Sequence, residues 1–130
     1  MLFAGVMAFA QEKQAEIKFE VTSHDFSNVS EGVQATYEFV FKNVGNVPLV
    51  LSSVNPSCGC TIPEWPKDPI GPGQSEKIKA IYNSSGRPGT FSKSITVNSN
   101  AKTATVILTI KGNVIPKATE PPSPVVNPTK

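Results

Sequence analysis

Apolar and polar residues alternate along most of the chain, and residues 11–130 contain no segment with the 3.6-residue period of a helix. The clearest alternation lies in residues 33–43, where one face carries Ala35, Tyr37, Phe39 and Phe41. A pattern of this kind is typical of a strand that buries one face. The same pattern predicts further strands at 17–22, 49–54, 76–82, 91–97 and 104–110, and residues 112–115 can extend the last of them.

Turn-forming residues separate these segments at about ten-residue intervals. We expect residues 23–29 to bend the chain and residues 43–48 to form a turn, in which Gly45 and Asn46 are able to take a positive φ. Residues 61–66 contain two prolines, so they fit only an edge strand or an extended segment, and Trp65 is expected to cover one end of the core. About seven short strands joined in this way predict an all-β fold, an immunoglobulin-like antiparallel β-sandwich.

The two ends of the chain differ from this strand-rich centre. Residues 1–10 are apolar and end in Ala-Phe-Ala, which fits cleavage by signal peptidase before Gln11. Because no positively charged residue precedes the apolar run, we interpret residues 1–10 as a truncated signal peptide. Residues 116–130 form a Pro-rich tail that we expect to be extended and disordered. The predicted domain is therefore 11–115, in a protein exported to the periplasm or the cell exterior.

Composition excludes several classes of function. Twelve Lys and Arg stand against ten Asp and Glu, giving a net charge of +2, and no basic stripe with interleaved aromatics indicates a nucleic-acid partner. The apolar run is too short for a membrane-spanning helix, which needs about 20 residues. Motifs of serine hydrolases, zinc proteases and nucleotide-binding loops are missing from the sequence. These observations favour a protein that is not an enzyme.

An ordered set of short motifs resembles a known family. The motifs are His24-Asp25-Phe26, Glu31-Gly32, Phe39-x-Phe41-x-Asn43-x-Gly45, Pro48-Leu49, Ser57-Cys58-Gly59-Cys60-Thr61, Pro72-Gly73, Tyr82-Asn83, Arg87-x-Gly89-x-Phe91-x-Lys93 and Ser99-Asn100. Together they are similar to the bacterial family known as domain of unknown function 1573, common in exported proteins of Bacteroidetes. The resemblance covers about residues 20–115.

The resemblance implies an immunoglobulin-like sandwich related to domains of cilia- and centrosome-associated proteins and of major sperm protein. At the level of fold it also implies a similarity to pilus chaperones. It implies no activity. One departure is visible, because the family usually has Gly after His-Asp-Phe, where this chain has Ser27.

Cys58 and Cys60 are the only cysteines, and three interpretations remain open for them. They can be small residues packed in a tight loop, with Gly59 supplying backbone freedom. They can form a disulfide in an oxidising compartment, although the small ring of a C-x-C bridge would be easily reduced. As thiolates they can bind a soft metal, Cu(I) or Zn²⁺, with His24 as the candidate third ligand.

Other polar residues have structural interpretations. Asp25 and Glu31 flank a predicted turn and are expected to satisfy backbone donors rather than to act as an acid–base pair. Arg87 lies in a Gly- and Pro-containing loop, where it can pair with a neighbouring acid or bind an anion.

The leading functional hypothesis is a non-catalytic binding or assembly module that meets a protein of the cell envelope. The contact would be made by an exposed strand edge or by the loop around Cys58. The alternatives are a Cu(I) or Zn²⁺ protein and, with less support, a thiol redox protein. Neither a cofactor nor a catalytic residue is predicted.

Overall fold

The structure is a computed structural model that describes residues 13–117. This part of the chain contains eight strands: β1 (Ile17–Phe19), β2 (Ser23–Ser30), β3 (Gln34–Asn43), β4 (Leu51–Pro56), β5 (Thr61–Glu64), β6 (Ser75–Asn83), β7 (Gly89–Ser99) and β8 (Thr105–Ile115). No helix occurs among the described residues. The predicted truncated signal peptide and residues 118–130 of the predicted tail lie outside them.

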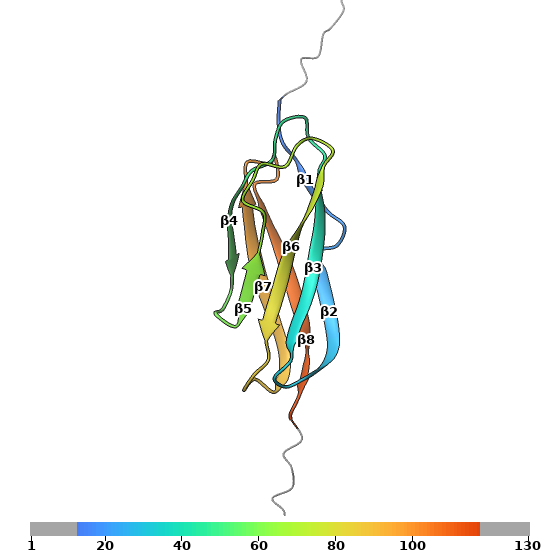
Figure 1. Ribbon diagram of the computed structural model, residues 1–130, viewed down its shortest axis with the longest axis vertical. Coiled ribbons are helices and arrows are strands. Elements are labelled where there is room, and N and C mark those ends of the chain that lie inside the picture. Colours follow the sequence, from blue (N-terminus) through green and yellow to red (C-terminus); the bar gives the residue numbers. More distant parts are fainter. Residues whose placement is uncertain (1–12, 118–130) are drawn as a thin grey trace, which may run out of the picture.

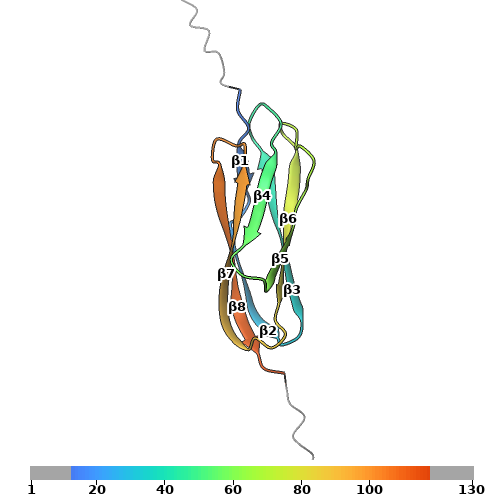
Figure 2. The same cartoon turned by 90° about the vertical axis from the view of Figure 1, so that its left-hand side faces the viewer.

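The strands form two four-stranded sheets that pack face to face (Figures 1 and 2). One sheet has the order β1-β3-β6-β5 and the other has the order β2-β8-β7-β4. All pairs are antiparallel except β2 with β8, which is parallel. The all-β sandwich predicted from the alternation is confirmed, with one parallel pair that the sequence pattern did not indicate.

The N-terminal strand region passes from one sheet to the other. Instead of one strand at 17–22, β1 ends at Phe19 and pairs with β3, and the chain then crosses to form β2 beside β8. The expectation that residues 23–29 bend the chain was therefore wrong. The segment forms β2, and a bulge between Asp25 and Asn28 contains Ser27 with a φ of 61°. The bulge shifts the phase of the alternation, which hid the strand in the sequence.

Inward-facing apolar residues of both sheets fill the space between them. Phe39, Phe41, Ile78, Ile95 and Leu108 have no solvent exposure. The face predicted for residues 35–41 is confirmed, and Trp65 packs partly buried against this core. The last strand was predicted to start at residue 104 but starts at Thr105. Ala104 lies exposed just before it, because the turn between β7 and β8 extends to that residue.

Aromatic rings of one sheet stack on aromatic rings of the other. Tyr82 of β6 stacks on Phe91 of β7 with ring centroids 3.9 Å apart. His24 of β2 stacks on Tyr37 of β3 at 3.7 Å. Because each pair has one ring from each sheet, these contacts hold the layers together without a disulfide between the sheets.

The buried side chain of Asn43 organises the turns at one end. Its Nδ2 donates to the carbonyls of Val47 and Ile70 at 2.8 and 2.9 Å, and its Oδ1 accepts the Gly45 N–H at 2.9 Å. Gly45 and Asn46 lie in a turn as predicted, and neither uses the positive φ that it is able to take. Glycine is required at position 45 because a Cβ there would lie 2.6 Å from the backbone nitrogen of Glu16.

Candidate functional site

The loop with both cysteines connects β4 to β5 and so crosses between the sheets at the edge where these two strands lie (Figure 2). Four hydrogen bonds hold it, three between backbone groups and one to the Ser57 hydroxyl. The Ser57 N–H donates to the Ser94 carbonyl at 2.8 Å, and the Ser94 N–H donates to Ser57 Oγ at 3.0 Å. At the other end the Cys60 carbonyl accepts the Asn83 N–H at 2.9 Å, and the Thr61 N–H donates to the Cys58 carbonyl at 3.4 Å.

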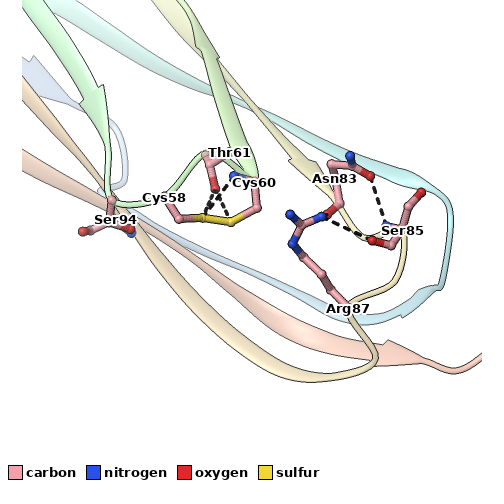
Figure 3. The surroundings of a disulfide bond; sticks show 8 residues. Cys58, Cys60, Thr61, Asn83, Ser85, Arg87 and Ser94 are labelled. Atoms are coloured by element: carbon pink, nitrogen blue, oxygen red, sulfur yellow. Dashed lines mark hydrogen bonds between the residues drawn. A yellow bond between two sulfur atoms is a disulfide. The ribbon is translucent and has the colours of Figure 1, made fainter.

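A disulfide joins Cys58 to Cys60 (Figure 3). The two sulfurs have different surroundings, because Cys60 is only 5% exposed whereas Cys58 is half-buried. The Cys60 N–H donates to the sulfur of Cys58 at 3.3 Å. Of the three interpretations that the sequence left open, the disulfide is the one that the structure contains.

The Thr61 hydroxyl is aimed at this disulfide (Figure 3). Thr61 is 2% exposed, and its Oγ1 lies 4.0 Å from the Cys58 sulfur and 3.9 Å from the Cys60 sulfur. These sulfurs are the only hydrogen-bond partners of the hydroxyl in the described structure. A disulfide sulfur carries no hydrogen, so the hydroxyl is the donor. The sequence motif includes Thr61, but only the register of β5 shows that its side chain turns inward.

Arg87 has a structural position beside this loop. Its Nη1 donates to the carbonyls of Asn83 and Ser85, both at 3.2 Å, and so closes the turn between β6 and β7 (Figure 3). The turn is also held by Glu31, whose Oε2 accepts the Gly86 N–H at 3.2 Å. Asp25 accepts the Ser27 N–H at 2.8 Å. Both carboxylates therefore satisfy backbone donors, as predicted.

The structure does not bring His24 to the cysteines. His24 lies on β2, at one edge of its sheet, whereas Cys58 follows β4 at the opposite edge. Its ring stacks on Tyr37 and meets the edge of Phe26 at 4.7 Å. Residues 13–117 contain no cluster of three or more His, Cys, Asp or Glu side chains that could hold a metal. Metal binding by the reduced thiols stays a prediction, without His24 as a neighbour.

A second candidate feature is the part of β7 that extends beyond β4. The pairing of β4 with β7 ends where Pro56 faces Ile95, so residues 89–93 have no strand on that side. Backbone groups in an antiparallel strand point alternately to its two neighbours. Those of Ser94 point toward the cysteine loop, as the two bonds with Ser57 show. The N–H and C=O groups of Thr90 and Ser92 therefore point the same way, where no strand lies.

These features define the fold as an immunoglobulin-like β-sandwich. PapD-like domain 7 of human CEP192 is similar in fold, with a TM-score of 0.66 and 13% identity. The similarity covers 92% of this chain and 99% of that domain. A protein of unknown function from Porphyromonas gingivalis W83 has a TM-score of 0.69 and 16% identity over 85% of this chain. The E. coli chaperone DraB has a TM-score of 0.53 and 14% identity over 82% of this chain and 58% of its own.

The chain belongs to the family described as protein of unknown function (DUF1573), whose model matches residues 17–114. The resemblance noted in the sequence is thereby confirmed. The chain spans about half of the P. gingivalis protein, with 51% of that chain covered. Comparison with curated proteins gives no match. Within residues 13–117, no helix has the length and apolarity needed to cross a membrane.

Proposed function

We propose that this domain is a non-catalytic binding module, exported to the cell envelope, that receives an extended segment of a partner protein along β7. The observation that carries the proposal is the unpaired backbone of Thr90 and Ser92. An extended peptide placed there would add a strand to the sheet, and main-chain hydrogen bonds would supply its affinity.

Three other strands with open segments, β4, β5 and β6, have less favourable chemistry. The part of β6 beyond β5 carries Lys77, which pairs with Glu38 of β3 at 3.1 Å. Charged residues, lysine above all, are a common protection of strand edges against pairing. The edge strands β4 and β5 are short and contain Pro56 and Pro63, which have no N–H to donate to an added strand.

In residues 89–93 of β7, the backbone groups on the open side belong to residues that are neither charged nor proline, although Lys93 lies at the end of the segment. The two residues with open backbone groups, Thr90 and Ser92, are small, uncharged and exposed. The anchored cysteine loop borders the segment at Ser94, so the two contact regions expected from the sequence adjoin. Similarity to proteins described as a chaperone and as PapD-like domains supports a binding role. Export is supported by the apolar residues 1–10 and by the disulfide, a bond typical of oxidising compartments.

A proline substitution tests the edge. Ser92→Pro removes an N–H that no strand of the domain uses, and it blocks the ladder to an added strand. We expect wild-type protein immobilised on resin to capture a partner from cell-envelope extract, and Ser92→Pro to lose at least nine-tenths of it.

The matched control is Thr36→Pro on β3, whose backbone N–H faces the open side of the other sheet, beyond the end of β1. Both variants carry the same substitution in an exposed strand position, so urea unfolding should show similar stabilities. Capture should survive in Thr36→Pro. Equal capture by Ser92→Pro and wild type would show that β7 is not the binding edge. Failure of the wild type to capture any protein would count against the binding function itself.

A further inference from the structure

The two sulfurs of the disulfide differ in their exposure to solvent. Cys60 is buried within the core cluster, while Cys58 only packs against that cluster and is partly open to solvent. Exchange with an external thiol requires a thiolate to reach one sulfur and the other sulfur to leave. The exposure therefore makes Cys58 the sulfur that is attacked and Cys60 the leaving group.

The surroundings also supply hydrogen-bond donors to sulfur. The Cys60 N–H already points to the Cys58 sulfur at 3.3 Å. The buried Thr61 hydroxyl, with no other partner in the described structure, lies within 4.0 Å of both sulfurs. Hydrogen bonds to an ionised group are stronger than those to a neutral one, so both donors stabilise a thiolate more than the disulfide. In redox proteins a helix N-terminus often has this role, and here a backbone amide and a hydroxyl can take it.

The loop does not depend on the disulfide for its shape. Ser57 makes two hydrogen bonds with Ser94. The Cys60 carbonyl accepts the Asn83 N–H, and the Thr61 N–H donates to the Cys58 carbonyl. These contacts involve no sulfur atom and would remain after reduction. The two thiols would stay neighbours and could close again, which a reversible exchange requires.

We propose that Cys58–Cys60 is a reversible thiol–disulfide exchange site, with Cys58 as its reactive sulfur and Thr61 as the residue that stabilises the Cys58 thiolate. An external thiolate attacks the Cys58 sulfur and forms a mixed disulfide. The Cys58–Cys60 bond breaks, its electron pair goes to the Cys60 sulfur, and that sulfur takes a proton from water. A second external thiolate attacks the external sulfur and releases the Cys58 thiolate. One protein disulfide is reduced while two external thiols become one disulfide.

The first experiment uses the wild-type chain. Oxidised protein is equilibrated with reduced and oxidised glutathione, quenched with maleimide and analysed by mass spectrometry. We expect a dithiol population that rises with the reduced fraction of glutathione. In fully reduced protein, a short maleimide pulse should label Cys58 about tenfold faster or more than Cys60, as their exposures require. A disulfide that stays oxidised in excess glutathione, or faster labelling of Cys60, would overturn the proposal.

The second experiment isolates the hydroxyl. In reduced protein at pH 7, Thr61→Val should slow labelling of Cys58 about threefold or more, while Thr61→Ser restores the rate. The matched control is Thr96→Val, because Thr96 is a half-buried threonine of β7 whose hydroxyl makes no hydrogen bond to sulfur in the described structure. It should leave the labelling rate of Cys58 unchanged. Tryptophan fluorescence in urea verifies that each variant is folded. Unchanged labelling in folded Thr61→Val would show that Thr61 has no part in the exchange.

Discussion

Ser27 offers a test of the fold at a single backbone angle. It lies in the bulge of β2 with a φ of 61°, and it is the only described residue other than glycine with a positive φ. A side chain in the left-handed region costs about 1–2 kcal/mol, whereas glycine adopts it without that cost. Glycine loses about 0.5–1 kcal/mol through the greater freedom of its unfolded chain. The difference between the two effects is about 0–1.5 kcal/mol, so Ser27→Gly should raise the free energy of unfolding by up to about 1.5 kcal/mol.

The exposed side chain of Ser27 makes no hydrogen bond in the described structure, so its removal adds no other loss. Ser27→Ala is the matched control, because it removes the hydroxyl and retains the Cβ. We expect Ala to lie within about 0.5 kcal/mol of wild type, and Val, which is β-branched, to destabilise the domain by about 1 kcal/mol or more. Urea unfolding followed by the fluorescence of Trp65 measures all three. A Ser27→Gly variant less stable than wild type would refute the reasoning.

Five further outcomes are expected from the structure and the sequence. Asn43→Leu should cost about 3 kcal/mol or more in urea unfolding, because it removes the buried side-chain hydrogen bonds to the Val47 and Ile70 carbonyls and to the Gly45 N–H. Gly45→Ala should cost about 1–3 kcal/mol, because the added Cβ would overlap the backbone near Glu16. Burial raises the pKa of Glu16, but hydrogen bonds to its carboxylate lower it more, so the pKa lies below its ordinary value of 4.5. The free energy of unfolding should therefore fall as the pH drops below 4.5, and it should fall less in Glu16→Gln. Replacing Cys58 and Cys60 together by Ser should cost only about 1.6 kcal/mol of loop entropy, and native mass spectrometry should show Cu(I) uptake by reduced wild type that this variant loses.

The sequence predicts the sheets wherever alternation runs without interruption. Residues 35–41 have the predicted inward face because no bulge breaks the period of β3. In β2 the inward-leaning residues are His24, Phe26 and Val29, and the extra residue at the bulge changes their spacing from two to three. The glycine that the family usually has at position 27 was the available signal, since it fits a positive φ at the bulge.

The site could be predicted only in part. Cys58 and Cys60 stand out as neighbours in the chain, but their oxidation state is not a pattern of residues. The inward position of the Thr61 hydroxyl depends on the pairing of Thr61 with Tyr82, which is a property of sheet register. The open backbone of Ser92 depends on where β4 ends relative to β7. Both features arise from contacts between distant segments, which local alternation does not encode.

The binding edge and the exchange site meet at the hydrogen bonds between Ser57 and Ser94, but they use different chemistry. A strand added along Thr90 and Ser92 would continue the line of Ser57, so one end of the partner segment would lie beside the cysteine loop. A cysteine at that end of the partner could then form a mixed disulfide with Cys58. Ser92→Pro should abolish capture without changing the reaction of Cys58 with glutathione, because that small thiol needs no strand pairing. If Ser92→Pro instead altered both properties, the edge and the loop would form a single site.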